Sequence, residues 1–180
     1  MALQMMLPGF TQAPGLSLAA PSTDLAAYPD VDPDILQHRA KEIGRAGELL
    51  VQSLLTRIGE RCYPAAEEEA FDLLLMHPEA ALRMQVKTKT NAQNGLYRFR
   101  MRRGYRGNPN GVQLYAPDAY DLAALVILPH NAVLFSAGAA ETHVITRAQI
   151  EALRRNPYLS LHQALGDLGL SASSTIAPIG

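Results

Sequence analysis

Four polar residues stand inside segments that are otherwise suited to a protein interior, and they limit how this chain can fold. Glu48 lies in the apolar-periodic run GRAGELLVQSLLTRIG, and Asp72 interrupts the hydrophobic segment FDLLLM. Gln85 and Lys87 stand two residues apart in LRMQVKTKT. Burying an unpaired carboxylate costs free energy, so Asp72 is expected to have partners in the fold. The function of the chain then depends on whether these four side chains come together.

The length and composition favour one compact domain. The chain has 180 residues, of which 48% are hydrophobic, and this is enough for a full core. Residues 1–31 are rich in Ala, Pro, Ser and Leu and contain no Lys or Arg, which predicts a flexible N-terminal arm that could bind a partner. We expect residues 32–170 to form a single domain and residues 171–180 to form a C-terminal tail.

A long amphipathic helix is expected to follow the arm. Asp32 is a good N-cap and Pro33 suits the first helical turn. At 3.6 residues per turn, Glu48 falls about 110° from the centre of the apolar stripe, on its boundary. Gly44 and Gly47 flank Glu48, and each glycine costs roughly 1 kcal/mol relative to alanine in a helix. They indicate close approach of a ligand or another backbone, or simple helix-on-sheet packing. The apolar stripe consists of Ile43, Ala46, Leu50, Val51, Leu54, Leu55 and Ile58, and Gly59 is the expected stop.

Three strands are predicted next, at residues 61–65, 70–76 and 82–90. In the third, apolar and polar residues alternate, so that Gln85 and Lys87 share one face with Arg83 and Lys89. This polar face is the candidate active face. Asn94-Gly95 predicts a turn, and we expect residues 96–101 to complete a hairpin with a basic face.

The C-terminal part completes an α/β pattern. The continuous apolar run 122–128 is typical of a buried central strand, and residues 132–137 are its expected hairpin partner. Thr146 with Gln149, and Ser160 with Gln163, predict capping boxes for two helices, which end near Arg155 and at residue 169. The order of elements predicts an α/β fold with a mixed central sheet flanked by helices.

Charge is distributed unevenly along the chain. The formal net charge is −1, yet residues 80–117 contain no Asp or Glu and eight of the sixteen Lys and Arg residues. Such a block can contact phosphates, and its aromatics (Tyr97, Phe99 and Tyr105) could stack on unpaired bases. Alternatively, the aromatics pack inward and the arginines are only solvated. The candidate nucleic-acid-binding residues are Lys89, Arg98, Arg100, Arg102, Arg103 and Arg106.

Several other classes of protein do not fit the sequence. Cys62 is the single cysteine, which excludes a disulfide within the chain and a cysteine-rich zinc site. The five histidines are scattered without metal-ligand spacing. The sequence contains no apolar run of about 18 residues, the length that would suggest a membrane span. The first Lys or Arg is Arg39, which argues against a secretory signal, so we expect a cytoplasmic protein.

The four polar residues suit metal-assisted hydrolysis of a phosphodiester. A Mg²⁺ ion can neutralise the phosphate and activate water when one or two carboxylates hold it. A lysine nearby can orient the water or stabilise the developing charge. Carboxylates and a lysine carried by a helix and two adjacent strands provide these groups.

The motifs G-x-x-G-E, F-D-L-L and Q-V-K-T resemble those of the PD-(D/E)xK nuclease superfamily, especially its Holliday-junction-resolvase-like and homing-endonuclease-like branches, over residues 40–137. The resemblance implies a restriction-endonuclease-like core and a Mg²⁺-dependent endonuclease acting on DNA, with Mn²⁺ as a substitute. It implies that Asp72 and Glu48 bind the metal, that Gln85 supports the metal as a further ligand through its amide oxygen, and that Lys87 is the catalytic lysine. Gln85 stands where the family usually has Asp or Glu. Phe71 replaces a common proline.

Other interpretations of the same residues remain open. A protein that kept the fold but lost catalysis would bind DNA or a protein partner, and the missing acid at position 85 favours this alternative. An enzyme of the same fold acting on RNA is a third possibility. Glu48 could instead be a helix-surface charge paired with Arg45 or Gln52, Asp72 could cap a turn, and Gln85 with Lys87 could line a solvated edge strand. A homodimer would suit cleavage of both strands.

Overall fold

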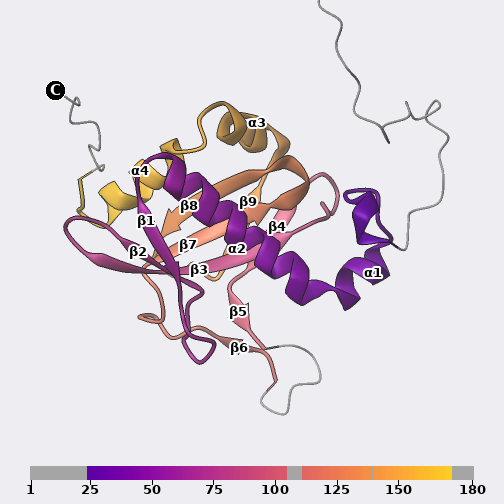
Figure 1. Ribbon diagram of the computed structural model, residues 1–180, viewed down its shortest axis with the longest axis horizontal. Helices are drawn as coiled ribbons and strands as arrows, with labels where there is room; N and C mark the ends of the chain where they lie inside the picture. Colours follow the sequence, from indigo (N-terminus) through magenta and orange to yellow (C-terminus); the bar gives the residue numbers. More distant parts are fainter. Residues whose placement is uncertain (1–23, 105–110, 139, 172–180) are drawn as a thin grey trace, which may run out of the picture.

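The computed structural model describes residues 24–104, 111–138 and 140–171. Its centre is a five-stranded mixed sheet in the order β1-β2-β3-β7-β8, in which β3 and β7 are parallel and the other neighbours are antiparallel. Helices flank this sheet (Figure 1). The predicted α/β fold with a mixed sheet is therefore confirmed. The sheet strands are β1 (Arg61–Pro64), β2 (Leu73–Met76), β3 (Ala81–Lys89), β7 (Leu122–Ile127) and β8 (Ala132–Ala137).

Two hydrophobic clusters cover the two faces of the sheet. On one face, α2 (Ala40–Arg57) and α4 (Leu159–Asp167) pack against alternate residues of β3 and β7, such as Met84 and Ala124. On the other face, α3 (Arg147–Arg155) packs with β4 (Tyr97–Arg100) and β9 (Thr142–Ile145) against residues such as Leu125. Every residue of β7 is buried, which confirms the prediction of a central strand.

The helix expected after the N-terminal arm is divided in two. Asp32 caps α1 (Pro33–His38) as predicted, its side chain accepting a hydrogen bond from the Asp34 amide. The chain leaves helical geometry at Arg39, and α2 then runs to Arg57. Ahead of α1, the structure describes a 3₁₀ turn, η1 (Leu25–Ala27), and a buried Val31, both inside the segment predicted as an arm. Residues 1–23 and 172–180, which hold most of the predicted arm and tail, lie outside the described residues.

The predicted hairpin after β3 is wrong in its pairing. Asn94 and Gly95 adopt positive φ angles and make the turn, but only Gln93 and Leu96 then bridge. β4 pairs instead with β9, a strand that the sequence analysis did not predict. The chain then forms a second two-stranded ribbon from β5 (Arg102–Arg103) and β6 (Gln113–Leu114).

The two predicted capping boxes had different outcomes. Thr146 and Gln149 form a complete capping box at the start of α3. Ser160 does not cap α4, which begins at Leu159 after Tyr158. Its hydroxyl accepts a hydrogen bond from the Phe135 amide at 3.1 Å, so this serine ties α4 to the sheet edge at β8. A short 3₁₀ turn, η2 (Leu128–His130), connects β7 to β8.

Candidate functional site

The candidate site forms where β3 extends beyond its neighbour β2. The register pairs Leu73 of β2 with Met84 of β3, and residues 85–89 of β3 pair only with β7 on the other side. The edge of β3 at Val86 therefore has main-chain groups without a strand partner. A buried main-chain N–H or C=O needs a hydrogen-bond partner, so side chains must provide one at this point.

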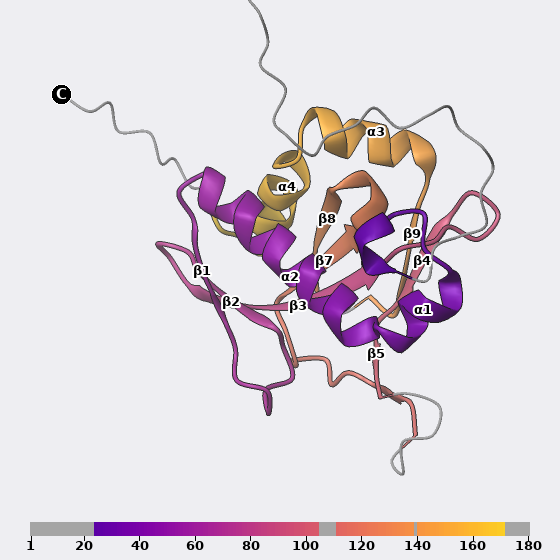
Figure 2. The ribbon, with the colours of Figure 1, turned by 45° about the vertical axis from the view of Figure 1, so that its right-hand side comes forward.

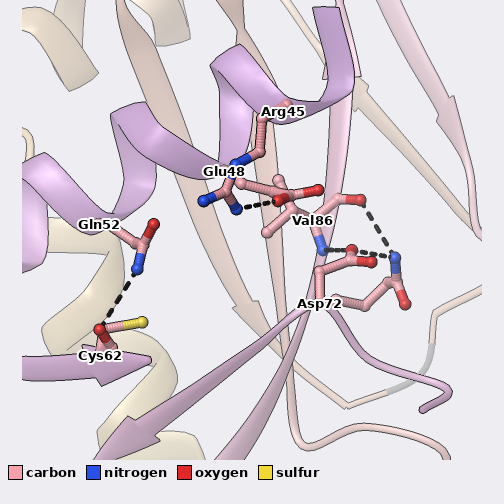
Figure 3. Close-up of polar contacts among 7 residues, drawn as sticks. Arg45, Glu48, Gln52, Cys62, Asp72 and Val86 are labelled. Carbon is pink, nitrogen blue, oxygen red and sulfur yellow. Dashed lines mark hydrogen bonds and ion pairs between the residues drawn. The ribbon is translucent and has the colours of Figure 1, made fainter. Parts of the chain in front are cut away.

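Asp72 and Gln85 satisfy both main-chain groups of Val86. The Val86 amide donates to Asp72 Oδ2 at 2.7 Å, and Gln85 Nε2 donates to the Val86 carbonyl at 3.2 Å (Figure 3). Gln85 Nε2 also donates to Asp72 Oδ2. Gln85 is only 3% exposed, so the alternative of a solvated edge strand does not describe it. Asp72 does not act as a turn cap here, because its side chain bonds across to β3.

The hydrogen bonds fix which way the Gln85 amide points. Both groups that Nε2 contacts, the Asp72 carboxylate and the Val86 carbonyl, are acceptors, so the nitrogen must face them. A metal ligand would have to be the amide oxygen. In this arrangement Gln85 supports Asp72 as a donor, and its predicted role as a direct metal ligand stays a prediction.

The surroundings of Asp72 oppose its ionisation. Burial raises the pKa of Asp72, and the nearby negative charge of Glu48 raises it further. The hydrogen bond from Val86, the positive charge of Lys87 and the hydrogen bond from Gln85 act in the opposite direction and lower the pKa. An additional positive charge nearby would favour the ionised form of this buried carboxylate. Such an environment is expected for a group that binds a cation.

Glu48 reaches the same place from α2. Its side chain is 24% exposed and points toward Val86 and Asp72, while Arg45 makes an ion pair with it at 2.7 Å (Figure 3). The predicted alternative of a pair with Arg45 is thus real, yet it coexists with a position beside Asp72. Glu48 and Asp72 both line a cleft of about 610 Å³ and a second cleft of about 530 Å³ next to it.

The two glycines around Glu48 have different roles. A Cβ atom on Gly47 would stand 2.0 Å from Thr88 Oγ1 of β3, whereas a Cβ on Gly44 would meet nothing within 4 Å. Gly47 therefore lets α2 approach β3 closely and so brings Glu48 to the sheet edge. Gly44 lines the first cleft and leaves space there.

Lys87 contacts a residue that the sequence analysis did not assign to the site. Its Nζ donates to the hydroxyl of Tyr115 at 2.8 Å and lies 5.1 Å from the centre of the Tyr115 ring. Burial lowers the pKa of Lys87, and the negative charge of Asp72 partly opposes this shift. Burial also raises the pKa of Tyr115 to about 12. Tyr115 comes 28 residues after Lys87 in a segment rich in Gly and Pro, where no local pattern connects the two.

The first cleft combines an apolar wall with a polar one. Leu36 of α1 and Ile43 of α2 line it, and so do Lys89 and Arg98. Figure 2 shows α1 next to the start of α2. Arg100 lines a neighbouring hollow of about 470 Å³ together with Lys89 and Arg98. These three predicted nucleic-acid-binding residues thus lie beside the candidate site.

The remaining predicted contacts to nucleic acid are placed differently. Arg102 makes an ion pair with Glu141, and Arg103 donates to Gln113. Arg106 lies outside the described residues. Tyr97 and Phe99 are 7% and 1% exposed, so the prediction that these two aromatics stack on bases is wrong. They pack into the second hydrophobic cluster because β4 turns its apolar face toward the sheet.

The acidic groups of the site are few. Among the described residues, no group of three or more His, Cys, Asp and Glu side chains could hold a metal ion. The site offers two carboxylates, from Glu48 and Asp72, with the Gln85 amide beside them.

Among the described residues, no helix has the length and hydropathy needed to span a membrane.

Comparisons with known proteins show a likeness in structure but none in sequence. No family model and no curated protein matches this sequence. Among solved structures, the fold is similar to that of a bacterial homing endonuclease, I-Ssp6803I, with a TM-score of 0.52 and 14% sequence identity. The likeness covers 66% of this chain and 96% of the homing endonuclease chain. At this identity the likeness shows that the two chains share a fold.

Proposed function

We propose that this protein is a metal-dependent endonuclease that hydrolyses DNA phosphodiester bonds with a site of the PD-(D/E)xK type. The observation that carries the proposal is the meeting of Glu48, Asp72 and Lys87 beside one cleft, although they come from α2, from the residue just before β2 and from β3. Basic residues on the cleft wall and the likeness to a homing endonuclease support DNA as the substrate.

The donor set suits a hard divalent cation. Mg²⁺ is usually held by one or two carboxylates and several waters, and Glu48 with Asp72 provides two carboxylates facing one cleft. Among the described residues, the hydrogen bonds from Val86 and Gln85 both go to Oδ2 of Asp72, which leaves Oδ1 for a ligand. Bound Mg²⁺, or Mn²⁺ in its place, supplies charge neutralisation at the phosphate and activation of a water molecule.

The protein's own residues orient and stabilise the reacting groups. Gln85 and the Val86 amide hold the Asp72 carboxylate in one orientation. The Lys87 ammonium donates hydrogen bonds to the attacking water or to the phosphate oxygen that gains charge. In this step the water oxygen bonds to phosphorus and gives up a proton to solvent. The bridging P–O bond breaks, and the leaving oxygen takes up a proton from solvent. Lys89, Arg98 and Arg100 bind the flanking backbone phosphates.

The test is cleavage of supercoiled, linear and branched DNA with Mg²⁺ or Mn²⁺. We expect wild-type protein to cleave, Asp72→Asn to be inactive, and Lys87→Ala to lose about 100- to 1000-fold in rate, as when a transition-state donor is removed. Asp167→Asn, at the exposed end of α4, is the matched control and should cleave normally. Undiminished cleavage by Asp72→Asn or Lys87→Ala would contradict the assignment. A parallel titration with RNA tests whether DNA is the preferred substrate.

A second candidate function is a non-catalytic module that binds DNA or a protein partner. The hydrogen bond from Gln85 to Asp72 and the ion pair from Arg45 to Glu48 favour it, because both carboxylates already have partners without a metal. Calorimetric titration with Mn²⁺ separates the two candidates. The nuclease requires binding that is lost in Asp72→Asn, whereas the module predicts no such binding.

A further inference from the structure

Lys87 is held by a tyrosine that lies outside every motif of the predicted site. The Lys87 ammonium donates to the Tyr115 hydroxyl at 2.8 Å and lies within cation–π range of the ring, at 5.1 Å from its centre. Among the described residues, Lys87 Nζ makes no other hydrogen bond. The hydroxyl and the ring therefore act together on one charged group.

Tyr115 is itself fixed by the core. It packs against the second hydrophobic cluster, and its ring meets that of Tyr120 edge to face, with centres 5.4 Å apart. Tyr120 is 3% exposed. Ordering a flexible lysine side chain costs considerable rotamer entropy. Because contact with a rigid ring already restricts Lys87, less entropy is lost when its ammonium group binds a substrate.

The position of Tyr115 leaves Lys87 able to act on a substrate. An ammonium group has three N–H donors, and the Tyr115 hydroxyl accepts one of them. The negative charge of Asp72 partly opposes the lowering of the Lys87 pKa by burial and adds to the raising of the Tyr115 pKa by burial. The remaining donors of Lys87 lie beside the cleft that Asp72 and Glu48 also line.

We propose that Tyr115 is a positioning residue that fixes the Lys87 ammonium beside the two carboxylates of the site. The inference rests on the proposed nuclease function for its catalytic consequence, but not for the contact itself. Tyr115 does not touch the reacting atoms. Its hydroxyl sets the direction of one Lys87 donor, and its ring limits where the ammonium can move.

A spectroscopic test examines the contact without using activity. The chain contains three lysines, Lys41, Lys87 and Lys89, so a protein labelled with ¹³C-lysine gives three resolvable ε-methylene signals. In wild type we expect the Lys87 signal to show a ring-current shift and slow side-chain motion relative to the other two. Both features should disappear in Tyr115→Leu and persist in reduced form in Tyr115→Phe, which keeps the ring.

Kinetics examine the consequence. Misplacing a catalytic group by about 1 Å can cost on the order of 100-fold, so we expect Tyr115→Leu to lower kcat by about that factor with KM within about twofold. Tyr115→Phe removes one hydrogen bond and should lower kcat about fivefold. Tyr63→Leu, at a tyrosine of β1 that is 52% exposed, is the matched control and should leave kcat unchanged. In a Lys87→Ala background, Tyr115→Leu should cause no further loss.

The outcomes separate this inference from the proposed function. Absence of the Lys87 signature in wild type, or an unchanged signature in folded Tyr115→Leu, would overturn the positioning role. An unchanged or raised kcat in Tyr115→Phe and Tyr115→Leu would overturn it as well, since Tyr115 would then only compete with substrate for Lys87. If wild type shows no cleavage but the signature is present and needs Tyr115, the proposed nuclease function fails and the positioning contact stands.

Discussion

At the scale of single residues, the site depends on the hydrogen-bond partners of the Val86 main-chain N–H and C=O groups. Asp72 accepts from its amide and Gln85 donates to its carbonyl, and Gln85 also donates to Asp72. A glutamate at position 85 could make neither donation. Gln85 thus stabilises the Asp72 carboxylate without adding a third negative charge next to Asp72 and Glu48, and this is the physical difference from an acid at the same position.

We predict that Gln85→Glu destabilises the metal-free protein and increases its dependence on divalent cations. The substitution removes two hydrogen bonds at a buried site and places a second carboxylate against Asp72, so the free energy of unfolding should fall by about 1–3 kcal/mol in EDTA. We expect Mg²⁺ or Mn²⁺ to bind only the folded protein and therefore to restore most of the lost stability. Urea denaturation with and without the cation measures both effects.

The control for this substitution is Gln163→Glu, on an exposed turn of α4. It introduces the same charge away from the site and should change the unfolding free energy by less than about 0.5 kcal/mol in either condition. An equal loss of stability in EDTA and in Mg²⁺ for Gln85→Glu would show that the site does not bind the cation through its carboxylates.

At the scale of elements, the distance between α2 and β3 decides whether Glu48 reaches the site. Gly47 stands over Thr88, and a methyl group there would overlap the Thr88 side chain. Thr88 Oγ1 is buried and, among the described residues, has no hydrogen-bond partner. The close packing of helix and strand therefore takes precedence over a hydrogen bond for this hydroxyl.

We predict that Gly47→Ala separates α2 from β3 and weakens the site. Overpacking of this kind typically lowers the free energy of unfolding by about 1–3 kcal/mol. Gly44→Ala, one turn earlier with open space around it, should instead raise it by up to about 1 kcal/mol. Thermal denaturation of both variants measures the difference.

A second substitution tests the cause. If the overlap with Thr88 is responsible, Gly47→Ala combined with Thr88→Ala should recover part of the lost stability, with a coupling energy above about 0.5 kcal/mol. Strictly additive effects of the two substitutions would contradict a steric contact between α2 and β3.

At the scale of the whole molecule, attraction to DNA depends on a small basic surface, because the formal net charge of the chain is close to zero. The formal net charge is −1, while Lys89, Arg98 and Arg100 gather around the clefts beside the site. A chain with this distribution is not expected to bind DNA over its whole surface. Its contacts with phosphates should be few and confined to this face. Whether two copies associate for cleavage of both strands stays a prediction.

We predict that the salt dependence of DNA binding reports these contacts. Each phosphate contact contributes about −0.9 to the slope of log K against log salt concentration. Arg98→Ala should therefore weaken binding and reduce the magnitude of the slope by about 1. Arg155→Ala, at the exposed end of α3, should leave both quantities unchanged. Fluorescence anisotropy with a short duplex at several salt concentrations measures the slopes, and equal slopes for all three proteins would exclude Arg98 as a phosphate contact.

Local sequence patterns were sufficient for much of the fold. The Asp32 cap and the Thr146 and Gln149 capping box mark helix starts, because a cap involves residues two or three positions apart. The continuous apolar run of β7 predicts a central strand, since a strand buried on both faces has no side that must be polar. Strand alternation likewise placed Gln85 and Lys87 on one face of β3.

Tertiary structure alone decided the contacts between residues far apart in the chain. β4 pairs with β9 rather than with β3, because its apolar residues Tyr97 and Phe99 pack into the second hydrophobic cluster together with Ile145 of β9. The donor role of Gln85 follows from β3 extending beyond β2, and the contact of Tyr115 with Lys87 follows from a loop that returns to the sheet. A local pattern fixes the face on which a side chain stands, whereas its partner depends on which strands meet, and that is set by packing of the whole domain.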